Sequence, residues 1–153
     1  MKAIVTNQIG MSLVEILVAI AIGSIGFLAL AAMQTTAMHG NTFSATTTDA
    51  TTLAQTQMEG LMRLTYSALT TDTELVDTDS DGDAGLNDAT AGTADSSLLD
   101  QPLNNWGYDI FWNISDDTPI TNTKTVNVIV AWTDPANGQH RTVSIQGTKP
   151  RIN

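Results

Sequence analysis

Residues 11–33 read MSLVEILVAIAIGSIGFLALAAM, an apolar run whose only charged residue is Glu15. About 20 consecutive apolar residues suffice to cross a bilayer as a helix, so this run is long enough to span one. Leu, Ala, Ile and Met dominate it, and the first proline of the chain is Pro102, so the composition favours an uninterrupted helix. The run therefore predicts a long N-terminal helix whose first part is a membrane anchor.

Glu15 is the unusual residue of this run. A carboxylate inside an apolar membrane segment costs roughly 2.5–3.5 kcal/mol on insertion scales and needs a partner. Residues 11–33 contain no Lys or Arg, but a cut after Gly10 would create an α-amino group on Met11, close to Glu15 in sequence. Residues 1–10, MKAIVTNQIG, would then be a short leader with one Lys and no acidic residue. Gly10 is therefore a candidate cleavage site, and Glu15 a candidate partner of the new amine.

The sequence GMSLVE at residues 10–15 resembles the cleavage site of type IV prepilins. The resemblance implies that a prepilin peptidase cuts after Gly10 and N-methylates Met11. It also implies that Glu15 neutralises the terminal amine of a neighbouring pilin subunit during assembly. The first mature residue of the family is usually Phe, where this chain has Met11. By this resemblance, the prepilin lies in the bacterial inner membrane until an assembly platform there moves it into an extracellular pilus.

Two further stretches, SIGFLALAAMQ at residues 24–34 and LAQTQMEGLMR at residues 53–63, resemble PilV-type minor pilins, the type IV pilus modification proteins. The resemblance covers residues 10–64 well and the remainder loosely. It implies a pilin-like α+β fold and a minor pilin that primes or shapes pilus assembly. A major type IV pilin, a type II secretion pseudopilin and a tip adhesin or ligand-binding module are the alternatives.

Two other interpretations of the N-terminus compete with the prepilin interpretation. Ala29-Leu30-Ala31 resembles the cleavage site of a secretory signal peptide, but the apolar run before it is long for such a peptide and contains Glu15. An uncleaved membrane anchor fits the length of the run, yet leaves Gly10 and Glu15 without a role. Only prepilin processing accounts for both residues.

The helix is predicted to continue through residues 34–66 as an amphipathic half. Its apolar positions follow helical spacing and are Ala50, Leu53, Ala54, Met58, Leu61, Met62 and Leu64. Residues 34–49 are polar and rich in Thr, a mediocre helix former, so this is the weakest part of the predicted helix. No heptad pattern persists through it, which argues against a coiled coil.

Residues 67–105 are predicted to form an acidic connection with a calcium-loop pattern. The stretch DTDSDGDAGLND at residues 77–88 fits D-x-D-x-D-G with an acid at the twelfth position. The predicted ligands are the side chains of Asp77, Asp79, Asp81 and Asp88 and the backbone carbonyl of Asp83. The twelfth residue is usually Glu, so Asp88 suggests weaker binding, and good flanking helices are missing. A solvated acidic turn is the alternative.

Residues 106–153 are predicted to form three antiparallel strands. Apolar residues alternate at Tyr108, Ile110, Trp112 and Ile114, and again at Val126, Val128, Val130 and Trp132. The turn sequence DPANG at residues 134–138 separates the second run from a return strand with Val143 and Ile145. Packed on the amphipathic half-helix, these strands would make an α+β head. We expect Trp106, Trp112 and Trp132 in its core, and a role as exposed binding residues is the alternative.

The composition limits the remaining function classes. A net charge of -10 argues against nucleic acid as a partner, because phosphates require clusters of Lys and Arg. The absence of Cys excludes disulfides and thiol chemistry. His39 and His140 are expected to be solvated, and no nucleophile–base motif or phosphate-binding loop is present. We therefore expect a structural protein and not an enzyme.

Overall fold

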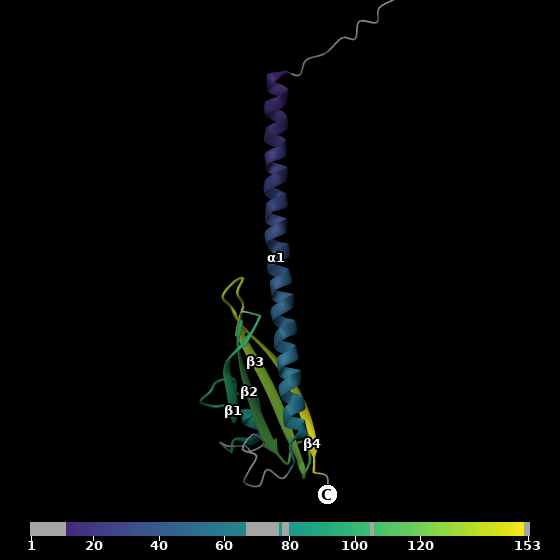
Figure 1. Cartoon of the computed structure of the whole chain (residues 1–153), viewed down its shortest axis with the longest axis vertical. Coiled ribbons are helices and arrows are strands. Elements are labelled where there is room, and N and C mark those ends of the chain that lie inside the picture. Colours follow the sequence, from purple (N-terminus) through teal and green to yellow (C-terminus); the bar gives the residue numbers. More distant parts are fainter. Residues whose placement is uncertain (1–11, 67–76, 78–79, 105, 152–153) are drawn as a thin grey trace, which may run out of the picture. The chain divides into compact units, whose positions relative to one another are not determined.

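The computed structural model of the chain describes residues 12–66, 77, 80–104 and 106–151. Its elements in chain order (Figure 1) are the helix α1 (Leu13–Arg63), the short 3-10 helix η2 (Gly82–Asn87), and the strands β1 (Ser96–Leu103), β2 (Trp106–Asp116), β3 (Thr123–Thr133) and β4 (His140–Pro150). The predicted α+β class, a long N-terminal helix followed by an antiparallel sheet, is confirmed. The chain divides into two compact units, Met1–Asn41 and Thr42–Asn153, which are treated separately below.

The Thr-rich middle of α1 is fully helical, although the sequence predicted it as the weakest part of the helix. Many of its threonine hydroxyls donate hydrogen bonds of 2.8–3.1 Å to the carbonyl four residues earlier. They belong to Thr35, Thr36, Thr47 and Thr48, and the pattern continues just after this stretch at Thr51, Thr52 and Thr56. A hydroxyl bonded in this way does not compete for backbone groups outside the helix, which offsets the poor helix propensity of Thr.

The sheet has the order β1-β2-β3-β4, and each neighbouring pair is antiparallel. The three strands predicted from the sequence are present, and β1 is a fourth strand inside the range predicted as a connection. Its sequence SSLLDQPL does not alternate cleanly and contains Pro102, which only an edge strand tolerates well. The strand conformation of β1 therefore depends on its pairing with β2. The register of this pairing shifts between Leu98 and Gln101.

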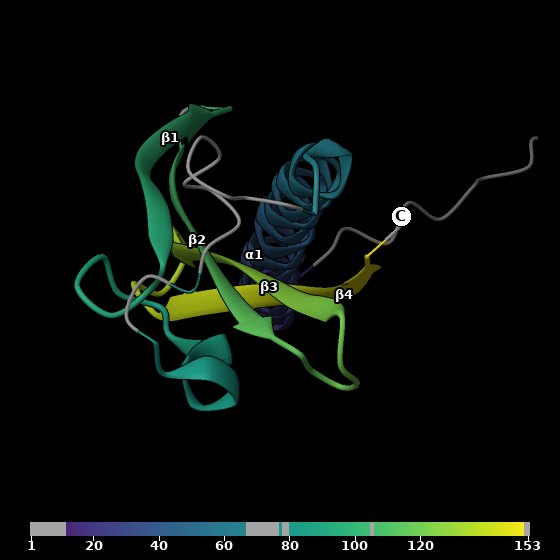
Figure 2. The ribbon, with the colours of Figure 1, turned by 90° about the horizontal axis from the view of Figure 1, so that it is seen from below.

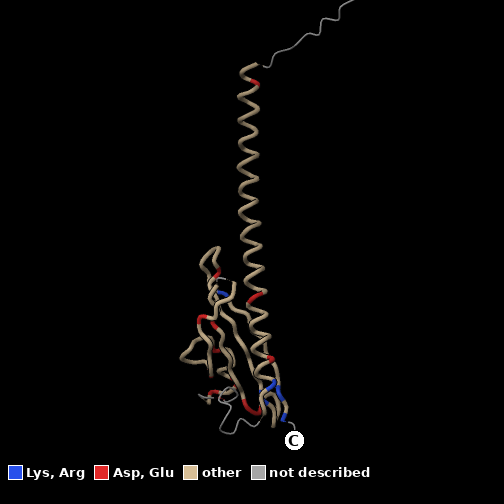
Figure 3. Tube along the Cα trace, viewed as in Figure 1, with Lys and Arg blue, Asp and Glu red and all other residues tan. Residues whose placement is uncertain are grey.

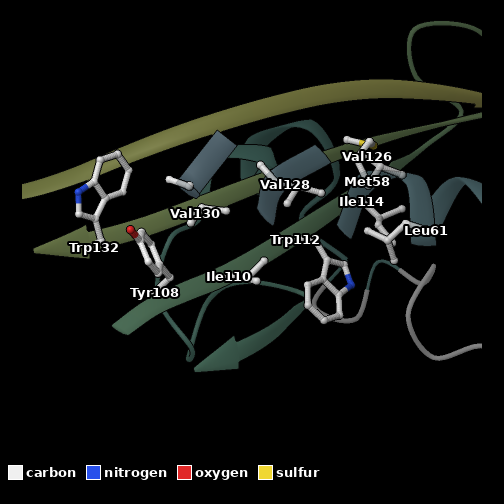
Figure 4. Packing of buried hydrophobic residues seen from close by; sticks show 12 residues of the cluster. Met58, Leu61, Tyr108, Ile110, Trp112, Ile114, Val126, Val128, Val130 and Trp132 are labelled. Atoms are coloured by element: carbon white, nitrogen blue, oxygen red, sulfur yellow. The ribbon is translucent and has the colours of Figure 1, made fainter. Parts of the chain in front are cut away.

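The main core of the second unit lies between the last turns of α1 and one face of the sheet (Figure 4). The predicted helix stripe is confirmed, since Ala50, Ala54, Met58 and Leu61 are buried and Leu53, Met62 and Leu64 pack against them. The predicted strand faces are also confirmed by the buried side chains Tyr108, Ile110, Trp112, Ile114, Val126, Val128, Val130 and Trp132. Trp106 departs from the prediction: it is 38% exposed and lies outside this core.

The opposite face of the sheet is buried as well, which the sequence did not predict. Phe111, Asn113 and Ser115 on β2 and Asn127 and Ile129 on β3 are each at most 5% exposed. Figure 2 shows the segment that includes η2 on the side of the sheet away from α1. The alternating pattern suggested that this face is solvated, because it carries the polar residues Asn113, Ser115 and Asn127. In the structure all three find hydrogen-bond partners in the covering segment.

The C-terminal end of α1 is held by a lysine from β4. Lys149 Nζ donates to the carbonyl of Met62 at 2.8 Å and also to the carbonyl of Leu64. The last carbonyls of a helix have no intrahelical partner, and a cation there also interacts favourably with the helix dipole. This contact links the helix end to the last strand of the sheet.

Candidate functional site

Glu15 lies in the first turn of α1, and its side chain is exposed. The helix begins with hydrogen bonds from the Glu15 and Ile16 amides to the Ser12 carbonyl, at 3.0 and 3.3 Å. An acidic side chain in a first turn interacts favourably with the positive end of the helix dipole. The predicted cleavage and methylation residues Gly10 and Met11 lie outside the described residues.

The apolar side chains of α1 in the first unit are not covered by the protein's own fold. Leu13, Phe27, Leu28 and Met33 are each about 70% exposed, and the other large apolar side chains of residues 13–33 are between 45% and 70% exposed. From residue 16 to residue 48 the chain contains no acidic or basic side chain, apart from His39, and Figure 3 shows this stretch of α1 without a charged position. Exposing so much apolar surface to water is unfavourable, at roughly 25 cal/mol per Å².

One side of this helix is hollowed beside Gly23. The groove, of about 430 Å³, is lined by Ile16, Ala19, Ile20, Gly23, Ser24 and Phe27. The Ser24 hydroxyl donates to the Ala21 carbonyl at 2.8 Å, so this polar side chain is satisfied within the helix. Small residues such as Ala19 and Gly23 allow another helix to approach closely. The surface is therefore suited to lipid or to other apolar helices.

Among the described residues, α1 is the one helix that is long and apolar enough to cross a membrane. Its apolar window is wholly unburied in the structure, unlike the core helix of a globular protein. Length and composition alone do not separate a membrane anchor from a signal sequence near the N-terminus.

The comparison with family models separates these two interpretations. Residues 5–31 match the model described as the prokaryotic N-terminal methylation motif. The match includes Gly10, Met11 and Glu15, the three residues that the sequence analysis selected. Comparison with curated proteins and with solved structures finds no match. The chain therefore carries a prepilin-type signal, which supports a pilin-like protein processed by a prepilin peptidase and assembled with other pilins.

The acidic segment is folded back on itself at Asp77. One carboxylate oxygen of Asp77, Oδ2, accepts a hydrogen bond of 3.1 Å from the Gly82 amide. Its other oxygen, Oδ1, is buried and accepts no hydrogen bond from the described residues. Gly82 has φ +59°, so it occupies the left-handed conformation that the sharp turn of the pattern requires. The first and sixth positions of the loop are therefore brought together.

The remaining predicted ligands are distributed along the same segment. Asp81 precedes η2, and its carboxylate lies over Gly85, where a side chain would collide with it. The Asp88 carbonyl accepts a hydrogen bond of 2.8 Å from Asn113 on β2. Asp79 lies outside the described residues, and within the parts of the chain that are described no three acidic, His or Cys side chains are grouped as metal ligands. The complete ligand set stays a prediction.

Asp83 points toward the sheet. Its Oδ1 accepts a hydrogen bond from the Ser115 hydroxyl. This bond and a second one from Thr118 hold the pKa of the Asp83 carboxyl below its ordinary value of 3.8. The side chain thus has a structural partner, which is compatible with the prediction that Asp83 would offer only its carbonyl to an ion.

Sequence reasoning missed two asparagines that fasten the acidic segment. Asn113 donates to the Leu86 and Asp88 carbonyls, and Asn127, opposite it on β3, donates to the Leu86 carbonyl at 2.5 Å. The signal was available, because an Asn in the middle of each of two apolar strands needs buried partners. What the sequence did not contain was the position of the segment that supplies them.

Proposed function

We propose that this chain is a minor pilin of a type IV pilus, of the PilV type. In this proposal the peptidase cuts after Gly10 and methylates Met11, and the chain enters the filament through its N-terminal helix. Its role is structural, to prime or shape the pilus, and not catalytic. The observation that supports it is the coincidence of the methylation motif at residues 5–31 with a helix whose apolar surface its own fold leaves exposed.

The exposed apolar surface of α1 suits two environments, the inner membrane and the core of a filament, and we propose that the chain moves from the first to the second. In the inner membrane lipid would cover the apolar part of α1, and in an extracellular filament the helices of other subunits would replace the lipid. In the filament, the methylated amine of a neighbouring subunit would neutralise Glu15. This would offset the free-energy cost of placing a carboxylate in apolar surroundings. An inner-membrane assembly platform would carry out the transfer.

The first experiment is mass spectrometry of the mature N-terminus. We expect a peptide that begins with N-methylated Met11. A chain that starts after Ala31, or that retains residues 1–10, would contradict the proposal. Glu15→Gln, which preserves size and removes the charge, should be processed normally but enter filaments poorly, whereas Glu59→Gln later in the same helix should assemble as the wild type does.

Gene deletion separates the proposal from its alternatives. Loss of the chain should reduce or alter piliation while leaving protein secretion intact. Loss of secretion with normal pili would indicate a type II secretion pseudopilin, and a subunit as abundant as the filament itself would indicate a major pilin. Specific binding of the purified protein to cells or glycans would indicate a tip adhesin.

We further propose that Ca²⁺ binds the acidic segment at residues 77–88. The observation that favours it is Asp77, whose buried Oδ1 accepts no hydrogen bond from the part of the chain that the structure describes, while its Oδ2 accepts one from the Gly82 amide. A buried, unpaired carboxylate oxygen is costly, and Ca²⁺ prefers such hard oxygen ligands. Asp79, Asp81 and Asp88 would complete the shell with the Asp83 carbonyl.

Thermal melting of the full chain in detergent tests this second proposal. Millimolar Ca²⁺ should raise the melting temperature relative to chelator, and Asp77→Asn should abolish the increase. Glu59→Gln removes the same charge from an exposed helix position and should retain it. Identical melting with Ca²⁺ and with chelator would rule out the ion.

A further inference from the structure

A second hollow lies at the end of the sheet where β2 and β4 begin and β3 ends. It has a volume of about 410 Å³, and its lining includes Asp100, Trp106, Asp109, Thr133 and His140. Small-molecule sites in proteins begin at about 300 Å³. The hollow belongs wholly to the second unit and contains none of the residues assigned above to processing, assembly or calcium.

The irregularity in β1 places one of its acidic residues. The register of β1 against β2 shifts between Leu98 and Gln101, and Asp100 within the shift has φ +50°. The Asp100 amide donates to Asp109 Oδ1 at 2.9 Å. The Asp100 carboxylate lies over Gly107, where an added Cβ would be 2.6 Å from Oδ1. The Asp100 carboxylate can therefore occupy this position only because Gly107 has no side chain.

The two carboxylates have no cationic partner within the described residues. The ion pairs there join Glu59 to Arg63, Asp116 to Lys124 and Asp134 to Arg141. Arg141, the basic residue at this end of β4, is thus engaged with Asp134, and it also lies over the Phe43 ring. Neighbouring like charges repel, so the hollow favours a positively charged occupant.

Trp106 supplies an aromatic surface beside these carboxylates. It is the tryptophan that the sequence analysis assigned wrongly to the core, and it is 38% exposed, whereas Trp112 and Trp132 are 3% and 5% exposed. Aromatic faces attract organic cations, Trp most strongly. Carboxylates add charge-assisted hydrogen bonds to N–H donors, and planar guanidinium groups bond to them well.

We propose that this hollow is a binding site for a small organic cation with a guanidinium or alkylammonium group. Asp100 and Asp109 bind its N–H groups, and Trp106 contacts its charged face. The site is independent of the proposed pilus role, because it uses neither the N-terminal helix nor the segment at residues 77–88.

Titration of the full chain in detergent micelles with methylguanidinium tests the proposal. The readout is the NMR signal of the Trp106 indole, assigned through Trp106→Phe. N-Methylurea, which has a similar shape and no charge, is the control ligand. We expect saturable binding of the cation that weakens with added salt, and at least tenfold weaker binding of N-methylurea. No saturable response to methylguanidinium, or equal binding of N-methylurea, would overturn the proposal.

Variants locate the binding. Asp100→Asn should weaken methylguanidinium binding about tenfold or more, the range for lost hydrogen bonds to charged groups. Asn tolerates the left-handed conformation, so this variant should retain the fold, which the melting temperature checks. Asp117→Asn, in the exposed turn after β2, removes the same charge and should change the affinity less than about twofold. Unchanged affinity in Asp100→Asn, and in Trp106→Leu followed through the backbone amide signal of Gly107 in the same hollow, would overturn the assignment.

Discussion

The two units of the chain differ in the solvent exposure of their apolar side chains. In the first unit the leucines, isoleucines and Phe27 of α1 are exposed, and in the second unit the apolar residues of the same helix are packed against a sheet. Burial of one such side chain is worth about 1.5–3 kcal/mol. The second unit obtains this stabilisation from its own fold. The first unit lacks this internal burial, so lipid or other helices would have to cover its apolar side chains to provide the same stabilisation.

The composition of α1 explains this difference. Residues 11–33 are apolar on every side, so no arrangement against a single small sheet could cover them. After residue 49 the apolar positions form one stripe, and a sheet face covers a stripe. The difference leads to four predictions, ordered by the expected size of the effect.

Matched leucine substitutions in α1 test the contrast most strongly. Leu61 is 1% exposed and Leu28 is 72% exposed. Leu61→Ala should lower the free energy of unfolding of the second unit by about 2–5 kcal/mol, because it removes buried contacts and leaves a cavity. Leu28→Ala should leave it unchanged. Unfolding of both variants by urea in detergent measures this, and equal losses would refute the contrast.

Asn113→Ala tests whether the far face of the sheet is a second internally covered layer. The substitution removes the donor to the Asp88 carbonyl, the acceptor of the Asp95 amide and one of two donors to the Leu86 carbonyl. We expect a loss of about 1–3 kcal/mol in the free energy of unfolding, the cost of buried unsatisfied groups. Asn137→Ala, in the exposed turn before β4, is the matched control and should cost less. A negligible effect of Asn113→Ala would mean that the covering segment is not fixed by this residue.

Lys149→Met tests the link between the end of α1 and the sheet. The side chain keeps much of its length, but the Met62 and Leu64 carbonyls lose their donor. Desolvation lowers the pKa of Lys149, so part of the gain from these bonds is already offset by burial. We expect a loss of about 1 kcal/mol, measured by urea unfolding. Arg151→Met, at an exposed position nearby in sequence, should have a smaller effect.

Ser115→Ala tests the electrostatic coupling between Asp83 and the sheet. The hydrogen bond from Ser115 is the main cause of the lowered pKa of Asp83. A lowered carboxyl pKa stabilises the fold above the ordinary value of 3.8, and this contribution is lost as the pH falls through the lower folded-state value. Without Ser115 the loss of stability on acidification should be shallower.

The pH dependence of the urea midpoint, measured in chelator to exclude effects of calcium, provides this comparison. Because Asp83 is solvent-exposed, the change should be the smallest of the four. Parallel wild-type and variant curves below pH 3.8 would contradict the coupling.

The N-terminal signal and the main core could be predicted from the sequence because both depend on local patterns. Gly10 and Glu15 stand out by residue type and spacing alone, and the helix stripe and the two alternating strands fix which side chains face inward. Propensity alone predicts the Thr-rich stretch to be the weakest part of the helix, because propensity scales do not include the hydrogen bonds from the threonine hydroxyls to carbonyls one turn earlier.

Other features depended on segments far apart in the chain. The sequence of the fourth strand, β1, has little strand character of its own. The strand forms because its backbone pairs with the edge of β2. Trp106 and Trp112 lie on the same strand, yet Trp106 is exposed and Trp112 is buried. The reason is that only Trp112 belongs to the core between α1 and the sheet.

By itself, the sequence determined that the chain carries an apolar helix with a processing signal and an α+β head, because these follow from composition and period. The tertiary structure decided that the acidic segment packs on the second face of the sheet and that Asp100, Asp109 and Trp106 line one hollow. Such contacts join residues that are distant in sequence or lie on different strands, and their partners are fixed only when the strands pair and both faces of the sheet are covered.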